Sequence, residues 1–295
     1  KVSTADDAST SENRETGGVE TSLTTQNEEV AGAAVSSHGS SPDLYGATDQ
    51  EMLVGVFNVR GVKNKQKTIA SFVQSKKISV LSLTETSLEC RGTDAKGECP
   101  DMTVEGYTLL SCPRPKNQKG GGVAFMVQSH LMEDRSFKDS FSFSHTSFEL
   151  AELTIRKSSP HPVHFFCLYR PPSTTKETFY EEFPGFLKYC RELKGNFIIM
   201  GDFNFPQLSP KILKILKEFG LSQGVKTATH EKGNILDWIL FQEDQQIVVA
   251  DSIFVHEERM TSDHNPVTCR LRISSNPAEV SVYGNGCDRL CIVTL

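Results

Sequence analysis

Short apolar runs that stop at a polar side chain constrain the fold of this chain more than any other feature of its sequence. In the clearest case, four apolar residues (197–200) lead through Gly201 to Asp202 and Asn204. A run this short, followed by a turn residue, predicts a buried strand. Side chains two residues apart on an extended chain point the same way, so the strand would deliver a carboxylate and an amide together. An Asp-x-Asn step also occurs as an ordinary turn that closes a strand.

Other apolar runs end in the same manner. The predicted strands and the polar residues after them are 52–57 with Asn58, 78–83 with Glu85, and 163–168 with Tyr169. A single acid after a strand is usually only solvated. Several polar side chains at one rim of a sheet are instead typical of an active site. Carboxylates, amides and a phenol together suit the hydrolysis of a phosphate ester with a divalent ion.

One acidic residue lies inside an apolar run rather than after it. Asp237 stands in the middle of the predicted strand 235–241, where an unpaired carboxylate would cost several kcal/mol. It therefore needs a partner. His264, which ends the segment Thr-Ser-Asp-His before the last predicted strand, is the natural candidate.

The remaining pattern alternates strands with a few helices. A helix is expected from Thr174 or Thr175 to about Leu193, with Pro184 bending or splitting it, and a short amphipathic helix is expected over 211–219. Further strands are predicted at 107–112, 121–127, 148–155, 247–255 and 267–273. The run at 148–155 alternates apolar and polar residues, which is typical of a strand.

Composition divides the chain into a body and two tails. Residues 1–50 are acidic and rich in Ser and Thr, and predict a disordered tail; 51–274 form the predicted domain, and 275–295 an unstructured tail. The formal net charge of -6 arises in the tails, so the nearly neutral body neither demands nor excludes a nucleic-acid partner. Cysteines without C-x-x-C spacing indicate an intracellular protein, and no apolar run approaches the roughly 20 residues that span a membrane.

Seven motifs occur in a familiar order. They are Phe-Asn-Val-Arg-Gly at 57–61, Leu-Thr-Glu-Thr at 83–86, Gly-Gly-Val-Ala-Phe at 121–125, Tyr-Arg-Pro-Pro at 169–172, Gly-Asp-Phe-Asn at 201–204, Leu-Asp at 236–237 and Ser-Asp-His at 262–264. Over about residues 52–273 the chain resembles the endonuclease/exonuclease/phosphatase superfamily, and the sequences of its motifs are most similar to the endonuclease domain of non-LTR (LINE-type) retrotransposons. The resemblance implies an α+β fold, a four-layer α/β/β/α sandwich of two mixed sheets flanked by helices.

The resemblance also implies a role for each matching residue. Glu85 would be the principal Mg2+ ligand, with Asn58 and Asp263 close to the metal, for which Mn2+ can substitute. Asp202 would activate the attacking water, Asn204 and Tyr169 would contact the phosphate, and Asp237 would orient His264. The residues that would bind substrate are Arg170, Ser262 and Thr229. Thr229 is equally compatible with being a plain loop residue. In this family the segment that begins at Thr229 often carries Thr-Arg, and it remains open whether His230 or Lys232 makes the equivalent DNA contact here.

The implied activity is a Mg2+-dependent nick in DNA that leaves a 3'-hydroxyl and a 5'-phosphate. The expected setting is a monomer in the nucleus, with a reverse transcriptase possible on a longer parent chain. Two alternatives stay open. The first is a catalytically inactive, domesticated module that binds nucleic acid or protein. The second is a phosphoinositide or phospholipid phosphoesterase of the same superfamily, although no membrane-facing apolar loop is evident in the sequence.

Overall fold

A computed structural model describes residues 50–88, 102–112, 120–138, 145–156, 161–245, 247–257 and 260–273. The chain divides into two units, Lys1–Tyr45 and Gly46–Leu295, and all of the described residues belong to the second. The tails expected at 1–50 and 275–295 lie outside the described residues, except for Gln50, which begins the first strand.

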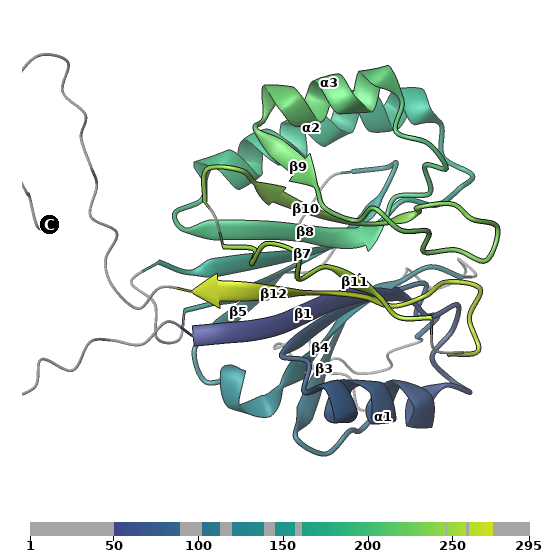
Figure 1. The fold of residues 1–295 in the computed structure, drawn as a ribbon, viewed down its shortest axis with the longest axis vertical. Coiled ribbons are helices and arrows are strands. Elements are labelled where there is room, and N and C mark those ends of the chain that lie inside the picture. Colours follow the sequence, from purple (N-terminus) through teal and green to yellow (C-terminus); the bar gives the residue numbers. More distant parts are fainter. Residues whose placement is uncertain are drawn as a thin grey trace, which may run out of the picture. The chain divides into compact units, whose positions relative to one another are not determined.

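Two six-stranded mixed sheets form the centre of the described unit (Figure 1). The first sheet has the order β11-β12-β1-β2-β4-β3. Its strands are β1 (Gln50–Asn58), β2 (Val80–Thr84), β3 (Tyr107–Cys112), β4 (Val123–Gln128), β11 (Phe254–Val255) and β12 (Val267–Ile273). Within it, β1 and β2 run parallel and the other neighbours run antiparallel.

The second sheet has the order β5-β6-β7-β8-β10-β9. Its strands are β5 (Arg135–Lys138), β6 (Glu149–Ile155), β7 (Val163–Tyr169), β8 (Asn196–Asp202), β9 (Leu221–Gln223) and β10 (Asp237–Gln242). Here β7 and β8 form the single parallel pair. Each sheet therefore contains one parallel pair, and the polar residues predicted from the sequence follow the carboxyl ends of these two pairs.

Helices cover the outer faces of the two sheets (Figure 1). Helix α1 (Gln66–Lys76) packs on the first sheet, and α2 (Lys176–Glu192) and α3 (Pro210–Glu218) pack on the second. The inner faces of the sheets share one core, in which Val54 and Phe125 meet Phe165 and Met200. The predicted four-layer α/β/β/α sandwich is confirmed. A short 3-10 helix, Ser129–Leu131, follows β4.

The helices begin and end where local chemistry requires it. Thr175 and Ser209 cap α2 and α3, because each side-chain oxygen accepts a backbone N–H three residues later. Lys77 ends α1 in the left-handed conformation at φ 56°. Pro184 lies inside α2, yet the helix continues across it as one element. Of the two outcomes predicted at Pro184, a bend or a split, the split is wrong, because the face that includes Phe183 and Phe186 remains buried against the sheet.

Gly201 allows β8 to lie close to β7 just before Asp202 and Asn204. A Cβ atom at this position would stand 1.8 Å from the backbone oxygen of Leu168 on the neighbouring strand, so only glycine fits. The parallel pairing continues to the pair of Tyr169 and Asp202. The last residues of β7 and β8 are therefore side by side at the edge of the second sheet.

One strand prediction needs correction. The run 247–255 contains only the two-residue strand β11 and an isolated bridge at Val248, because Asp251 adopts φ 54° and the turn at 249–252 interrupts the extended chain. The polar residues that alternate along β6 are not solvated. Glu152 and Thr154 are buried, since α2 and its Tyr189 cover that face.

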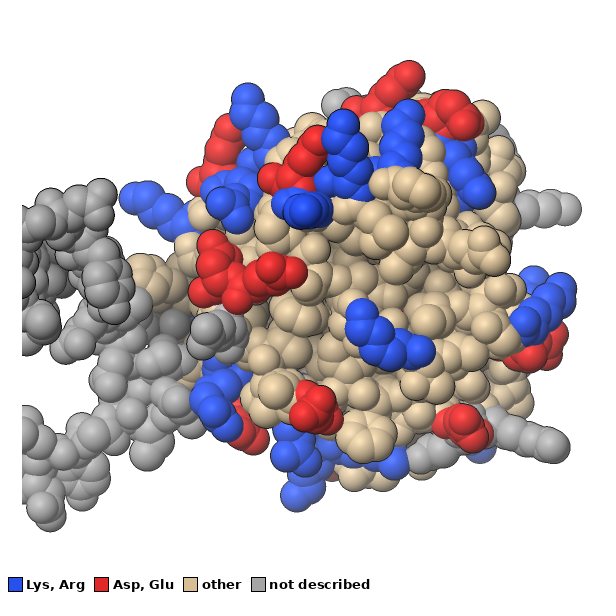
Figure 2. Space-filling model, turned by 45° about the horizontal axis from the view of Figure 1, so that its top comes forward, with Lys and Arg blue, Asp and Glu red and all other residues tan. Residues whose placement is uncertain are grey.

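The outer surface over α2 and α3 carries charges of both signs. Figure 2 shows Lys and Arg gathered over these helices, with Asp and Glu interspersed. On α3 the exposed Lys214 forms an i,i+4 ion pair with Glu218, with 3.8 Å between nitrogen and oxygen. A mixed surface of this kind is typical of a solvated helix face and differs from the single-sign patch of a nucleic-acid footprint. Among the described residues, no helix combines the length and the apolar composition needed to cross a membrane.

Candidate active site

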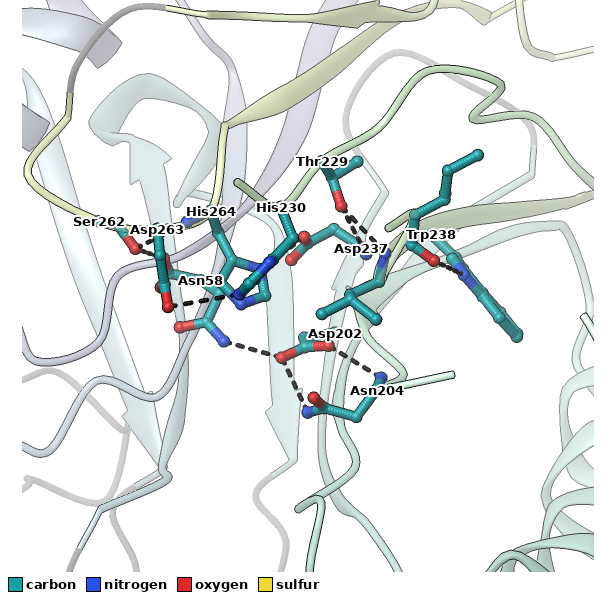
Figure 3. Close-up of polar contacts among 12 residues, drawn as sticks. Asn58, Asp202, Asn204, Thr229, His230, Asp237, Trp238, Ser262, Asp263 and His264 are labelled. Atoms are coloured by element: carbon teal, nitrogen blue, oxygen red, sulfur yellow. Dashed lines mark hydrogen bonds and ion pairs between the residues drawn. The ribbon is translucent and has the colours of Figure 1, made fainter. Parts of the chain in front are cut away.

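The polar residues that follow the strands meet at one edge of the sandwich (Figure 3). Asn58 links the two sheets, because its amide nitrogen donates to Glu85 Oε1 at 2.9 Å and to Asp202 Oδ2 at 2.8 Å. Its amide oxygen accepts the backbone N–H of Arg60 at 3.1 Å. Asn58 is fully buried. Three residues that the sequence placed after three separate strands thus form one hydrogen-bonded group.

Asp202 and Asn204 face the same way, as their spacing predicted. Asp202 Oδ1 accepts the backbone N–H of Asn204 at 2.9 Å, and Asp202 Oδ2 accepts its side-chain nitrogen at 3.0 Å. The same nitrogen donates to the backbone oxygen of Arg170 at 2.9 Å. Both amide hydrogens of Asn204 are therefore engaged within the protein, and a contact to a phosphate oxygen requires that one of these partners be exchanged.

Asp237 and His264 form the buried pair that the sequence predicted. His264 Nδ1 lies 2.7 Å from Asp237 Oδ2, and both residues are almost completely buried. Ligand atoms of Asp202, Asp237 and His264 lie within 4.8 Å of one another. Among the described residues, the buried Asp237 Oδ1 has no hydrogen-bond partner, which is uncommon in a folded protein and typical of a functional site.

The electrostatics of this group favour proton transfer. Burial, followed by the neighbouring charge of Asp237, raises the pKa of Asp202 to about 8, close to neutral pH, where a carboxyl group can both take up and release a proton. Burial by itself would lower the pKa of His264, but the charges of Asp237, Asp202 and Asp263 raise it to about 9. A cationic imidazole therefore stands beside a carboxylate whose proton affinity is increased.

Tyr169 is held as a neutral phenol. Burial, followed by the charges of Glu85 and Asp202, raises its pKa, so its O–H remains a donor over the physiological range. Glu85 itself adopts φ 52°, a conformation that non-glycine residues rarely adopt and that is often found at functional sites. Its side chain is only half-buried, in contrast to Asp202.

The segment that contains Ser262, Asp263 and His264 is tied to both sheets. Ser262 Oγ donates to the backbone oxygen of Asn58 at 2.8 Å and accepts the backbone N–H of His264 at 3.3 Å. Asp263 Oδ2 pairs with the guanidinium of Arg60 and lies 3.3 Å from His230 Nε2. The hydroxyl of Ser262 is therefore used within the protein, where it fixes the segment on the end of β1.

The predicted metal ligands offer a suitable set of oxygens. Glu85 and Asn58 are in direct contact, and Asp263 retains a buried oxygen, Oδ1, without a hydrogen-bond partner. Carboxylate and amide oxygens are the ligands that Mg2+ prefers. The residues present therefore fit a hard divalent cation at this edge, where Glu85 and Asp263 are both partly exposed carboxylates.

Two of the predicted substrate contacts lie below the surface. Arg170 is 3% exposed, and its guanidinium donates to the backbone oxygens of Asn204 and Thr174. Thr229 is fully buried, and its hydroxyl accepts the backbone N–H groups of Leu236 and Asp237. This burial argues against the direct contacts predicted for both residues. They instead fix the backbone on either side of the site.

His230 and Arg60 are the residues that sequence reasoning did not place. The side chain of His230 is only 10% exposed and points at Asp263, so it faces the site rather than a DNA surface. Its only sequence signal is its position after Thr229 in the segment where related chains often carry Arg. Arg60 lies within the Asn-Val-Arg-Gly motif, two residues after Asn58.

Comparison with known proteins identifies the family to which this chain belongs. The chain belongs to the Endonuclease/Exonuclease/phosphatase family, whose model matches residues 55–264. No curated protein sequence matches the chain. Among solved structures, one similar in fold is the endonuclease domain of TRAS1, a telomere-specific non-LTR retrotransposon, at 14% identity and a TM-score of 0.56. The match covers 76% of this chain and 99% of that one.

Other solved structures with this fold act on different phosphate esters. The AP endonuclease LMAP from Leishmania major is 16% identical over 76% of this chain and 88% of its own, with a TM-score of 0.57. The mannosyl-6-phosphatase Bt3783 from Bacteroides thetaiotaomicron is 17% identical over 74% and 98%, with a TM-score of 0.51. At these identities the likeness establishes the fold, and the substrate must be argued from the site.

Proposed function

We propose that this protein is a Mg2+-dependent endonuclease that nicks DNA by phosphodiester hydrolysis, leaving a 3'-hydroxyl and a 5'-phosphate. The observation that carries the proposal is the direct contact of Asn58 with both Glu85 and Asp202, beside the buried pair of Asp237 and His264. In this proposal Glu85 is a metal ligand, Asp202 is the proton acceptor and His264 is the cationic imidazole at the same edge of the sandwich.

The residues divide the chemistry among them. Ionised Asp202 accepts a proton from the attacking water, and its raised pKa increases its proton affinity. The new P–O bond forms as the bond to the 3'-oxygen breaks, and that oxygen takes a proton from solvent to give the 3'-hydroxyl. His264, kept cationic by Asp237, stabilises the charge that develops on the phosphate oxygens. Tyr169 donates its O–H to the same phosphate. Mg2+ held by Glu85, Asn58 and Asp263 would supply Lewis-acid polarisation of the phosphate oxygen.

Two arguments support DNA as the substrate over the alternatives. The chain resembles retrotransposon endonucleases in three motifs, Asn-Val-Arg-Gly, Tyr-Arg-Pro-Pro and Leu-Asp-Trp. The endonuclease domain of the TRAS1 retrotransposon also has a similar fold. An inactive binding module would have no need to keep Asn58, Asp202 and His264 in one hydrogen-bonded and charged group. The retrotransposon origin, the action beside a reverse transcriptase on a longer parent chain, the nuclear location and the monomeric state belong to this proposal.

A plasmid-relaxation assay tests the proposal. Purified protein would be incubated with supercoiled plasmid in Mg2+ and in EDTA, beside the variants Asp202→Ala and Arg272→Ala. Arg272 is an exposed residue paired with Glu51 at the opposite end of β1, so its replacement is the matched control. We expect open circles only with Mg2+, and only from wild type and Arg272→Ala.

The ends of the nick and the competing substrates complete the test. A 3'-hydroxyl is extended directly by a DNA polymerase, so extension without prior phosphatase treatment would support the proposed polarity. Folded wild-type protein that leaves the plasmid supercoiled but releases phosphate from a sugar phosphate or a phosphoinositide would replace DNA by that substrate. Folded protein that binds DNA without any hydrolysis would instead favour the binding module.

A further inference from the structure

Arg60 follows Asn58 on a turn whose backbone is fixed at every step. Its φ of 44° and the φ of 89° at Gly61 are both left-handed. The N–H of Arg60 donates to Asn58 Oδ1 at 3.1 Å, and the N–H of Gly61 donates to the backbone oxygen of Glu85 at 2.7 Å. Lys65 Nζ donates to the backbone oxygens of Val59 and Arg60. A non-glycine residue in this conformation carries a strain cost that the surrounding bonds must offset.

The guanidinium of Arg60 lies among the acids of the site. It pairs with Asp263 Oδ2. The pKa of Arg60 is raised, chiefly by Asp263 and to a smaller extent by Glu85 and Tyr169. The positive charge of Arg60 therefore interacts with Asp263, Glu85 and Tyr169, the groups that the proposed mechanism assigns to binding the metal or the phosphate.

Exposure separates Arg60 from the other polar residues of the site. Its side chain is 54% exposed, whereas that of its partner Asp263 is 16% exposed. An ion pair with so much contact with water is weak, so exchange of the partner costs little. A guanidinium has the planar fork that matches two oxygens of a phosphate.

Asp263 keeps a second donor when Arg60 leaves. His230 Nδ1 accepts the backbone N–H of Lys232 at 3.1 Å, which places the proton of the neutral ring on Nε2. This nitrogen lies 3.3 Å from Asp263 Oδ2. The backbone N–H of Glu231 also donates to the backbone oxygen of Asp263 at 2.9 Å. The carboxylate therefore stays in place without Arg60.

We infer that Arg60 binds a phosphate of the substrate backbone at the mouth of the site, exchanging Asp263 for that phosphate when the substrate arrives. The inference rests on the proposed nuclease function and adds to it a substrate-binding residue. It assigns Arg60 to binding and leaves proton transfer to Asp202 and His264. The competing explanation is that Arg60 acts only through Asp263, as a positioning residue for the metal site.

Arg272 provides a control that matches Arg60 closely. Its side chain is also 54% exposed and also pairs with a carboxylate, that of Glu51, with 3.3 Å between nitrogen and oxygen. The two arginines stand at opposite ends of β1. Replacing either by Ala removes one positive charge from a half-exposed ion pair, so the overall loss of charge is the same.

The experiment measures steady-state cleavage of a short DNA duplex by wild type, Arg60→Ala, Arg60→Lys and Arg272→Ala at several salt concentrations. For Arg60→Ala we expect KM to rise about 10-fold with kcat changed less than about 3-fold, and the salt slope of log KM to fall by about one. Arg60→Lys should restore part of the binding, because it keeps the charge without the fork. Arg272→Ala should match wild type in KM.

Binding of the same duplex with Ca2+ in place of Mg2+ gives a readout without turnover. Weaker binding by Arg60→Ala than by Arg272→Ala supports the inference. Loss of kcat with KM, salt slope and Ca2+ binding unchanged would overturn it and make Arg60 a positioning residue. If wild type binds the duplex but cleaves no DNA, the nuclease proposal fails, while the two Ala variants still test the phosphate contact separately.

Discussion

Two clusters of buried acids occupy the second sheet, and they differ in how completely they are hydrogen-bonded. Glu152 on β6 is 1% exposed. Its two oxygens accept bonds from Lys138, Tyr189 and Thr154, and His164 Nδ1 lies 3.1 Å from Oε1. Burial would raise its pKa, but His164, Tyr189 and Lys138 lower it to about 2. At the other cluster, burial and Asp237 raise the pKa of Asp202, and Asp237 Oδ1 has no partner.

The difference separates stability from function. A fully bonded carboxylate such as Glu152 is held ionised and stabilises the fold, since each donor would be left unpaired without it. At the strand ends, burial and the neighbouring charge of Asp237 instead raise the proton affinity of Asp202, which suits it to proton transfer. Two clusters of similar burial therefore predict opposite results when an acid is replaced by its amide.

The largest effect is expected for Asp202→Asn. The amide cannot accept a proton from water, so turnover should fall about 10²-fold or more. The unfolding free energy should change by only about 1 kcal/mol, because relief of a buried charge offsets one lost acceptor. Plasmid nicking and urea unfolding measure the two quantities. Unchanged turnover would remove Asp202 from the mechanism.

Glu152→Gln should reverse this balance. The amide nitrogen would face donors such as Tyr189, so the unfolding free energy should fall by about 2–3 kcal/mol, with turnover per folded molecule unchanged. Glu51→Gln, at a half-exposed acid on β1, is the control and should change stability by less than about 0.5 kcal/mol. A loss of turnover in folded Glu152→Gln would break the comparison.

The strand-end residues could be predicted from the sequence because they mark abrupt ends of apolar runs. Asp202 and Asn204 share one side of the chain through their spacing alone, and the pairing of Asp237 with His264 follows from the cost of a buried charge. The sandwich followed from the resemblance, with which the order of strands and helices agreed. These features depend on local pattern or on a large energetic penalty.

The other features depend on tertiary packing that no local pattern encodes. Thr229 and Arg170 looked like substrate contacts, but each satisfies backbone groups brought close by the fold. The burial of Glu152 depends on helix α2, which covers it and lies elsewhere in the sequence. The inward orientation of His230 likewise depends on its bridge to His264.

Thr229→Val should fall between the two clusters in its effects. Valine keeps the shape of threonine but leaves the N–H groups of Leu236 and Asp237 without their acceptor. We expect a loss of about 1–2 kcal/mol in unfolding free energy and a drop in turnover of roughly 10-fold, since Asp237 is displaced from His264. Thr229→Ser, which keeps the hydroxyl, should recover most of both. If Thr229→Ser is as damaged as Thr229→Val, packing of the methyl group matters more than the hydroxyl.

The smallest effect concerns pH. Because the pKa of Glu152 is lowered to about 2 from 4.5, its stabilisation is complete above pH 4.5 and is lost as the pH falls toward 2. The difference in unfolding free energy between wild type and Glu152→Gln should therefore shrink between pH 6 and pH 3. Glu182, whose pKa is also lowered to about 2 by its bonds to Ser147 and Thr146 despite burial, is present in both proteins and cancels. Urea unfolding at the two pH values measures the change, and a constant difference would mean that Glu152 stabilises the fold by packing rather than by its charge.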